Sequence, residues 1–397
     1  MSDFSYVKKL LEGVEVVWFP ISEVTERTTN VKWRETLKSH QYIDLTSVSV
    51  DTKKIIETTE VDASNAPSRA QKLVKKDDVI FATTRPTQMR YCLIDEEYNG
   101  AVASTGYCVL RVKRDVILPK WILYLISSSD FKKYLEENQS GSAYPAISDA
   151  KVKDYSIPIP CPDNPEKSLA IQAEIVRILD VFTAMTAELN AELNMRRKQY
   201  GHYQFELLKF TETTQQLSIG ECCGINKGAT PIKKATPGKY PLVATTEERQ
   251  SSSEYQFDCP AVCVPLISSR GHGVASIDRI YYQDGKFALG NILCAITPND
   301  SEVLSAKFLR YYLFDKKDVL LVPLMRGGAN VSLTMDSLKK VKIPIPPIAE
   351  QQRIVRALDK FDEFVKALPR EIELRQKQYE YYRDLLLSFP NQEKMTV

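Results

Sequence analysis

Two long segments of the chain carry hydrophobic side chains at alternating steps of four and three residues. In the later segment this spacing is held by Ile354, Leu358, Phe361, Val365, Leu368, Ile372, Tyr379, Tyr382, Leu386 and Phe389, with Arg375 in the remaining slot. In the earlier segment it is held by Ile175, Leu179, Phe182, Thr186, Leu189, Leu193, Arg196, Tyr200, Tyr203, Leu207 and Phe210. Such a rhythm over about five heptads is typical of coiled-coil helices. We therefore predict two helices of roughly 36 residues, each about 54 Å long.

The two segments are copies of one another. QAEIVRILDVF begins at Gln172 and QQRIVRALDKF at Gln351, a shift of 179 positions that holds without a gap through KQY at Lys198 and Lys377. Upstream, SIPIPCP begins at Ser156 and KIPIPPI at Lys342, a shift of 186, so the first copy has seven extra residues in its linker. A constant shift over so long a stretch indicates an internal duplication.

The prolines set the limits of the helices. In each IPIP the proline ring fixes its own φ and forces the preceding isoleucine into an extended conformation, so the motif is a stiff lead-in outside the helix. Ser168 and Pro347 stand near plausible helix starts. Pro369 falls within the second heptad pattern, where we expect a kink or a short break.

A narrow apolar stripe needs a partner, and the other copy is the economical one. The expected arrangement is an antiparallel coiled coil whose halves are related by pseudo-two-fold symmetry. The alternative is that both are ordinary long core helices. Arg196 and Arg375 occupy equivalent seam slots, where long cations normally extend to solvent, although they could also meet a partner subunit or DNA.

Residues 1–154 and 211–340 resemble each other only faintly, but both combine short β-rich runs with an aromatic-apolar stretch that looks helical. The fold class is therefore α+β, with each mixed α/β globule followed by a long helix. The expected divisions are 1–154 for the first globule, 155–210 for the first helical segment, 211–340 for the second globule, 341–390 for the second helical segment, and 391–397 for a tail.

Composition restricts the function only loosely. Apolar residues are 43% and charged residues 26% of 397, and the formal net charge of +2 neither demands nor excludes nucleic acid. No apolar run approaches a membrane span of about 20 residues and MSDFSYVKKLLEG lacks an apolar signal core, so we expect a cytoplasmic protein with reduced cysteines. The spacing of Cys222, Cys223, Cys259, Cys263 and His272 fits no standard zinc finger, so no metal is expected.

Catalytic motifs are not evident. The sequence contains neither a phosphate-binding Gly-x-x-x-x-Gly-Lys-Ser/Thr loop nor the Asn/Asp-Pro-Pro-aromatic tetrapeptide of an amino-methyltransferase. Asp149 and Lys151 resemble the end of a nuclease carboxylate–lysine pair but lack a convincing upstream aspartate. We therefore expect a non-catalytic chain.

The two IPIP-to-EQQ segments, the EIVRxLDxF phrase and the KQYxxY helix ends resemble the specificity subunit of type I restriction–modification enzymes. The resemblance covers the whole order of globule, helix, globule and helix, although the first copy departs from it with CPDNPEKSLAIQ in place of PPIAEQ. It implies two target-recognition domains that each read one half of an asymmetric bipartite site in double-stranded DNA. It also implies that the helix pair sets the spacer between the half-sites and docks two modification (methyltransferase) subunits.

The same resemblance implies that adenine methylation and host defence depend on the partners of this chain. S-adenosylmethionine would be bound by the modification subunits, and ATP and Mg by two restriction (motor) subunits in complexes that restrict DNA. This chain itself would need no cofactor. The alternatives are a standalone metal-dependent nuclease and a coiled-coil scaffold that binds only proteins.

DNA contacts require basic and hydrogen-bonding side chains on presented loops. In the first globule the candidates follow the run DVIFA: Thr83, Thr84, Arg85, Gln88 and Arg90. In the second globule they follow AVCVPLI: Ser268, Ser269, Arg270 and His272. The lysines of INKGATPIKK could hold phosphates: Lys227, Lys233 and Lys234.

Overall fold

The computed structural model describes residues 13–232, 235–246, 250–271, 274, 275, 277–328 and 330–389. The chain divides into two compact units. Unit 1 comprises Met1–Ala191 with Arg370–Val397, and unit 2 comprises Glu192–Pro369. Each unit therefore contains one globule and a stretch of both long helices. No helix among the described residues is long and apolar enough to cross a membrane.

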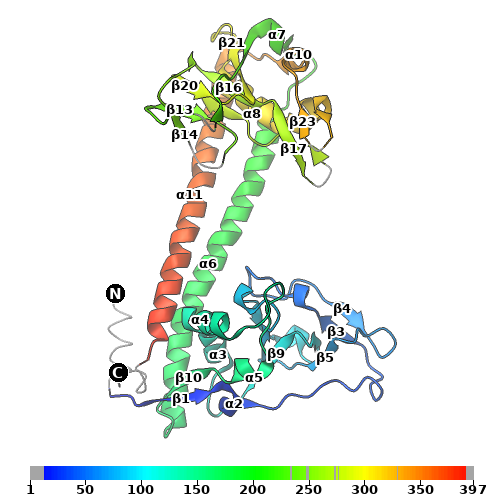
Figure 1. The fold of residues 1–397 in the computed structure, drawn as a ribbon, viewed down its shortest axis with the longest axis vertical. Coiled ribbons are helices and arrows are strands. Elements are labelled where there is room, and N and C mark those ends of the chain that lie inside the picture. Colours follow the sequence, from blue (N-terminus) through cyan, green and yellow to red (C-terminus); the bar gives the residue numbers. More distant parts are fainter. Residues whose placement is uncertain are drawn as a thin grey trace. The chain divides into compact units, whose positions relative to one another are not determined.

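Unit 1 is built on two four-stranded sheets and one two-stranded sheet (Figure 1). The first sheet has the order β2 (Thr25–Glu26), β9 (Tyr107–Val112), β6 (Val79–Ala82) and β7 (Tyr91–Leu93). The second has the order β4 (Thr59–Val61), β3 (His40–Ile43), β8 (Val102–Ser104) and β5 (Ala70–Leu73). The two-stranded sheet pairs β1 (Val16–Pro20) with β10 (Ser156–Pro160). Every pairing is antiparallel except that of β3 with β8.

Unit 2 repeats this topology strand for strand. One sheet has the order β12 (Cys223–Lys227), β21 (Leu293–Pro298), β16 (Ala261–Pro265) and β19 (Tyr281–Gln283). Another has the order β14 (Gln250–Ser252), β13 (Tyr240–Val243), β20 (Lys286–Leu289) and β15 (Phe257–Asp258), again with one parallel pair, β13 and β20. The two-stranded sheet pairs β11 (Gln216–Ser218) with β24 (Lys342–Pro344). The two globules therefore share one fold, although their sequences resemble each other only faintly.

Unit 2 adds a sheet that has no counterpart among the described strands of unit 1. Its order is β18 (Val274–Ala275), β17 (Ile267–Gly271), β23 (Asn330–Ser332) and β22 (Arg326–Gly327). Strand β17 comes directly after β16, the equivalent of β6. The two globules therefore differ where each predicted DNA-contacting segment begins.

Short helices cover the sheets and are capped as their sequences indicate. Unit 1 has α2 (Ile21–Val24), α3 (Pro119–Leu125), α4 (Ser129–Asn138), α5 (Asp149–Lys153) and the 3₁₀ turns η1 (Leu45–Ser47), η2 (Pro86–Gln88) and η3 (Glu96–Tyr98). Unit 2 has α7 (Ile219–Cys222), α8 (Ala306–Asp315), α9 (Lys317–Leu320), α10 (Met335–Lys339) and the 3₁₀ turn η5 (Val322–Leu324). Ser128 and Ser305 accept hydrogen bonds from the first turns of α4 and α8, satisfying amides that the helix leaves unpaired.

The prediction that IPIP is extended is confirmed for the whole first copy, which lies in β10, and for Ile343 and Pro344 of the second copy, which lie in β24. Each copy pairs with the strand that opens its own globule. In unit 1 the buried Trp121 indole also donates to the carbonyl of Pro158 at 3.1 Å. The motif therefore fastens the two ends of a globule together before the long helix begins.

The long helices are α6 (Pro165–Leu207) and α11 (Ile348–Leu386). Since Pro165 corresponds to Pro344 by the shift of 179, α6 starts about one turn earlier in its copy than α11 does. Of the two outcomes expected at Pro369, the short break is wrong, because α11 is helical without interruption across this residue, and the kink stays a prediction. A proline removes one backbone hydrogen bond, and a helix of 39 residues retains many others.

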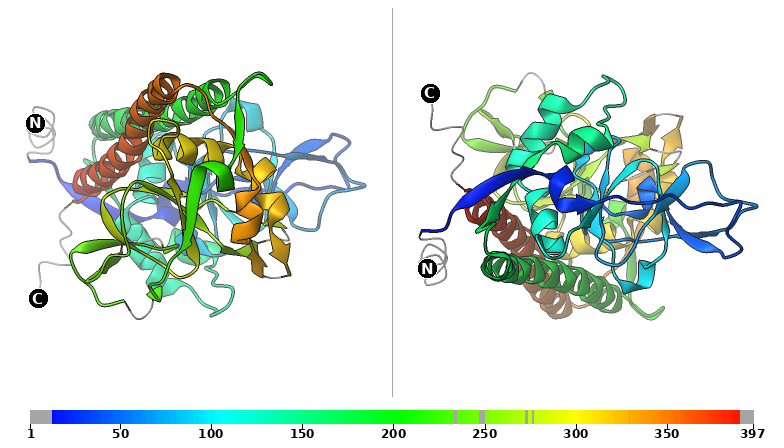
Figure 2. Two further views of the ribbon diagram at one scale, coloured as in Figure 1. Left: turned by 90° about the horizontal axis from the view of Figure 1, so that it is seen from above. Right: turned by 90° about the horizontal axis from the view of Figure 1, so that it is seen from below.

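Within each unit a stretch of α6 lies beside a stretch of α11 (Figure 2). In unit 1 the ring centroids of Phe182 and Tyr382 are 5.5 Å apart. In unit 2 Tyr203 stacks on Phe361 at 5.3 Å. All four residues occupy predicted heptad positions, and the pairs run forward along α6 as they run backward along α11. The antiparallel coiled-coil packing is thus present in both units.

The charged seam positions point outward. The Arg196 Nε lies 2.6 Å from a Glu192 carboxylate oxygen, and an Arg375 guanidinium nitrogen lies 3.8 Å from Glu371. Both are partly exposed pairs one helical turn apart on a single helix. The predicted extension of these cations to solvent is therefore seen.

Candidate nucleic-acid interface

The segment after β6 is fixed at its start by Thr83. Thr83 is 8% exposed, and both its backbone amide and its hydroxyl donate to the carbonyl of Gly106, at 2.8 and 2.9 Å. A hydroxyl held in this way supports the loop rather than reaching outward. We therefore assign Thr83 to the support of the surface and not to the DNA contact proposed from its sequence position.

The turn that follows has two residues in the left-handed region. Arg85 (φ 50°) and Met89 (φ 53°) flank the single turn η2. Lys53 donates to the Met89 carbonyl, and Arg90 donates to the carbonyl of Val48. The predicted contact Arg90 is thus directed into the globule, where it anchors the end of the turn.

Lys53 was not among the predicted site residues. Burial lowers its pKa to about 8, and the nearby charge of Arg90 acts in the same direction, against the opposing effect of Asp51. Its ammonium lies 4.6 Å from the ring centroid of Tyr91. No sequence pattern indicates this position, because residues 53 and 89 meet only after the chain has folded.

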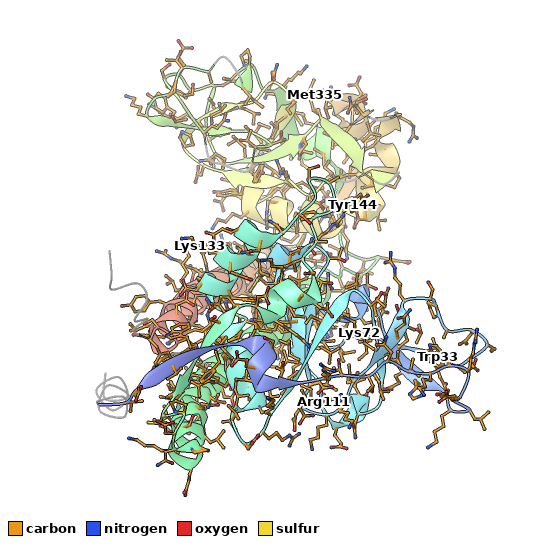
Figure 3. All side chains as sticks on the ribbon, turned by 60° about the horizontal axis from the view of Figure 1, so that its bottom comes forward. Trp33, Lys72, Arg111, Lys133, Tyr144 and Met335 are labelled. Atoms are coloured by element: carbon orange, nitrogen blue, oxygen red, sulfur yellow. The ribbon has the colours of Figure 1, made fainter. Side chains whose placement is uncertain are left out.

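The remaining candidates of this segment are accessible. Thr84, Arg85 and Gln88 are all exposed. Thr84 forms a β-bridge with Ala146, and the Arg85 guanidinium lies 5.4 Å from the ring centroid of Tyr144. Tyr144, labelled in Figure 3, lies in SGSAYPAIS, whose small residues indicate a turn but give no sign that it joins this surface.

In unit 2 the corresponding residues form a strand instead of a loop. Ser268 and Ser269 belong to β17 and pair with Val331 and Asn330 of β23. The expectation of a loop after AVCVPLI is wrong in this respect, because β22 and β23 extend the sheet there. Arg270 is also in β17, whereas His272 lies outside the described residues.

The lysines proposed for phosphate contact are only partly described. Lys227 ends β12 and is exposed, and its carbonyl accepts a hydrogen bond of 2.8 Å from Gln256. Lys233 and Lys234 lie outside the described residues. Nearby strands carry lysines on tyrosine faces, with Lys286 at 4.9 Å from Tyr255. This part of unit 2 therefore combines exposed cations with aromatic surface.

The described part of the chain offers little support for a metal site or a nuclease active site. No group of three or more His, Cys, Asp or Glu side chains there is arranged to hold a metal ion. Asp149 forms an ion pair with Lys72 at the start of α5, which gives this carboxylate a structural role. Burial raises the pKa of the Cys92 and Cys108 thiols to about 12, so they remain protonated and unreactive.

The repeated sequence carries a glutamine that joins each long helix to its globule. Gln172 is fully buried; its side-chain oxygen accepts from the Leu118 amide at 2.9 Å and its nitrogen donates to the Val116 carbonyl at 3.0 Å. Gln351 makes the same two contacts with Ser305 and Val303, at 2.9 and 2.8 Å. Both joints are thus built from the same bonds.

The aspartate of the repeated LDxF phrase makes a second joint. In unit 1 Asp180 accepts from Tyr124 at 2.6 Å and pairs with Lys120 at 2.7 Å. In unit 2 Asp359 accepts from Tyr311 at 2.8 Å and pairs with Lys307 at 2.9 Å. Burial, helped by the accepting carboxylate, raises the pKa of both tyrosines, so they stay protonated as donors.

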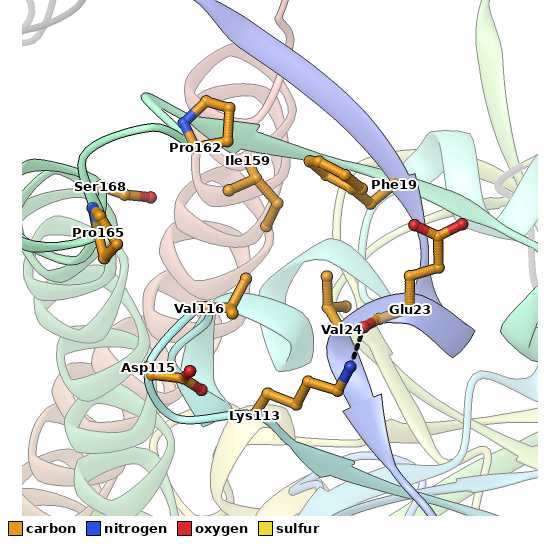
Figure 4. Close-up of a pocket in the computed structure, with 10 residues that line it drawn as sticks. All are labelled: Phe19, Glu23, Val24, Lys113, Asp115, Val116, Ile159, Pro162, Pro165 and Ser168. Carbon is orange, nitrogen blue, oxygen red and sulfur yellow. Dashed lines mark hydrogen bonds between the residues drawn. The ribbon is translucent and has the colours of Figure 1, made fainter.

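A pocket of about 260 Å³ lies beside the first joint (Figure 4). Its lining comes from β1, α2, the turn before α3, the end of β10 and the start of α6: Phe19, Glu23, Val24, Lys113, Asp115, Val116, Ile159, Pro162, Pro165 and Ser168. Lys113 donates to the Glu23 carbonyl at 2.7 Å. With two carboxylates and an otherwise largely apolar lining, the pocket does not suit a phosphate backbone.

Comparison with known families agrees with this architecture. The model of the type I restriction modification DNA specificity domain matches the chain twice, at residues 19–196 and 211–374. Each match contains one globule and much of the helix that follows it. The duplication read from the helices therefore extends to the whole chain.

Relatives and solved structures match over nearly the full length. The chain is 36% identical to the EcoR124I/EcoR124II specificity subunit of Escherichia coli over 100% of both chains. It is 29% identical to a putative type I specificity subunit of Haemophilus influenzae, S.HindORF215P, over 97% of this chain and 98% of that one. Two solved structures share the fold. One comes from work on complex assembly and conformational transition of the type I R-M system (TM-score 0.60, 23% identity, 94% and 96% coverage). The other is the S subunit from M. genitalium (TM-score 0.56, 14% identity, 95% and 97% coverage). The chain belongs to the family of type I restriction–modification DNA specificity subunits.

Proposed function

We propose that this chain is the DNA-recognition subunit of a type I restriction–modification complex, with unit 1 and unit 2 each reading one half of a split site. The observation that carries the proposal is a duplicated frame with unequal surfaces. Ten strands recur in the same order in both globules, whereas the segments after β6 and β16 differ in both sequence and secondary structure. Two readers that differ at this point should recognise different sequences, so the complete site should be asymmetric.

The long helices supply the connection between the readers. Because Gln172 and Asp180 fasten one globule to α6, and Gln351 and Asp359 fasten the other to α11, each reader is held firmly to its own helix. We infer that this helical frame sets the spacer between the half-sites and docks two methyltransferase subunits. Two DNA segments about one helical turn, roughly 34 Å, apart would suit such a frame.

The chemistry of the complex belongs to the partners. We infer that S-adenosylmethionine is bound by the modification subunits, and ATP and Mg by restriction subunits where these join. Within this chain, we propose that DNA is contacted by the exposed residues Thr84, Arg85, Gln88 and Lys227 and by three residues of β17, Ser268, Ser269 and Arg270. Arg90, which is half-buried, and Thr83, which is buried, support this surface.

Methylome sequencing of cells that express the chain with its modification subunits tests the proposal. The expected result is methylated adenine in a single motif made of two different half-sites with a spacer of constant length. Variants of unit 1 surface residues should alter one half-site, and variants of unit 2 the other. Absence of motif-specific methylation in the presence of assembled modification subunits would contradict DNA recognition, as would binding that is insensitive to salt.

A further inference from the structure

Arg85 and Tyr144 come from separate loops of unit 1 and meet at its surface. The guanidinium carbon lies 5.4 Å from the centroid of the Tyr144 ring, within the range of a cation–π contact. Tyr144 is 72% exposed, a high value for a large aromatic side chain. A ring left this open does not stabilise the core, so its contact with Arg85 is the feature that requires explanation.

The backbones of the two loops are tied together. The Arg85 amide donates to the Pro145 carbonyl at 2.6 Å, and Thr84 forms a β-bridge with Ala146. Ala146 and Ser140 exchange backbone hydrogen bonds of 2.8 and 2.9 Å, which close the turn that carries Tyr144. The arginine and the ring are therefore brought together before any ligand arrives.

Arg85 occupies a backbone conformation that favours glycine. Its φ of 50° and ψ of 55° place a side chain in the left-handed region, which is disfavoured for every residue with a Cβ. Strained positions of this kind concentrate at functional sites. The strain is tolerable here because Lys53 and Arg90 hold the end of the same turn.

The Arg85 guanidinium is not neutralised within the described part of the chain, where no carboxylate forms an ion pair with it. By contrast, Arg90 donates into the globule and Arg114 pairs with Asp77 at 2.6 Å. An aromatic face beside the guanidinium limits the orientations of its plane and leaves its edge donors available. That edge matches the O6 and N7 acceptors of guanine in the major groove.

We propose that Arg85 reads a guanine in the half-site recognised by unit 1, and that Tyr144 is the positioning residue that orients its guanidinium. This rests on the proposed DNA-recognition function and adds to it a base and two residues with distinct roles. Tyr144 acts through its ring, so a phenylalanine at this position should preserve the base preference.

The test uses the full chain expressed with its modification subunits, and genomic adenine methylation is the readout. The variants are Arg85→Gly, Tyr144→Ala and Tyr144→Phe, with Arg114→Ala as the control for loss of an exposed arginine. Arg85→Gly should reduce discrimination at one G·C pair of one half-site by about fivefold to 150-fold. Tyr144→Ala should reduce it at the same pair by about two- to fivefold. Tyr144→Phe and Arg114→Ala should preserve it.

Several results would overturn the inference. One is unchanged base preference in Arg85→Gly or Tyr144→Ala; another is loss in Tyr144→Phe as large as in Tyr144→Ala. A uniform fall in methylation at all sequences would make Arg85 a phosphate contact. Because glycine suits the backbone at position 85, loss of folding is not expected to obscure the first variant, and thermal unfolding of each variant checks this. If the wild-type chain directed no split motif, the DNA-recognition function would itself fail, which distinguishes that failure from a failure at Arg85.

Discussion

The buried glutamine at the first joint offers a quantitative test of how the globule is held to its helix. In Gln172→Leu the side-chain volume is nearly kept, but the Leu118 amide and the Val116 carbonyl lose their partners. Each unsatisfied group costs about 1–3 kcal/mol, and the cost falls toward the lower end of this range for a group that is only partly buried. Both groups here are partly buried, so the two together should lower the free energy of unfolding by about 2–4 kcal/mol. Against a typical stability of about 5–15 kcal/mol this is large, and it corresponds to roughly 4–16 °C in Tm for a unit of this size.

Tryptophan fluorescence measures this loss in unit 1 alone. All three tryptophans, Trp18, Trp33 and Trp121, belong to that unit. Urea unfolding of the full chain should therefore show a lower tryptophan-detected midpoint for Gln172→Leu. The matched variant Gln351→Leu should lower the stability of unit 2 by a similar amount while moving the tryptophan-detected midpoint less.

The surface control is Gln376→Leu, the same substitution at an exposed position of α11 within unit 1, which should change the free energy of unfolding by less than about 0.5 kcal/mol. A change below that value in Gln172→Leu as well would refute the argument. It would mean that water replaces the glutamine at both backbone groups and that the joint does not depend on these bonds.

Three further outcomes follow from the geometry. Arg85→Gly should be more stable than Arg85→Ala by about 1 kcal/mol, since only glycine relieves the left-handed conformation at φ 50°; equal urea midpoints would contradict this. The pKa of Lys53 is lowered from 10.5 to about 8 in the folded chain. Between pH 8 and 10.5 the unfolded chain therefore binds more protons than the folded chain does. The free energy of unfolding of the wild type should rise with pH over this range, relative to that of Lys53→Met. Parallel stability curves of the two proteins from pH 7.5 to 9.5 would show that this shift is absent. Adding one heptad to both α6 and α11 lengthens each helix by about 10.5 Å, which corresponds to about three base pairs of DNA. Methylome sequencing should then find a longer spacer and unchanged half-sites. Altered half-sites would contradict the role of the helices in spacing.

Much of the frame could be predicted from the sequence because it depends on local periodicity. The heptad pattern predicted the seam positions, and the residues that the structure pairs across the seam, Phe182 with Tyr382 and Tyr203 with Phe361, all belong to it. The paired prolines of IPIP predicted an extended segment, because φ restriction acts on neighbouring residues. The break expected at Pro369 did not occur, because the rest of a long helix maintains the conformation around one missing bond.

The residues of the proposed DNA-contacting surface could be predicted only in part. The segment from Thr83 to Arg90 was located correctly as a loop after a buried strand, but sequence order could not separate Thr84 and Arg85, which are exposed, from Thr83 and Arg90, which support the turn. Tyr144 and Lys53 were missed because their partners lie 59 and 36 positions away in the chain. The strand β17 was missed because its pairing partner β23 is distant in sequence.

The duplication, the two amphipathic helices and the rigid segments that precede them can all be predicted from the amino-acid sequence, since each is a pattern of neighbouring residues. The folded structure is needed to see that two dissimilar globules share one strand order, and that the repeated glutamine and aspartate fasten each globule to its helix. It also decided which basic side chains remain outside. Those properties depend on contacts between residues far apart in the chain, and burial is settled only when the whole unit has packed.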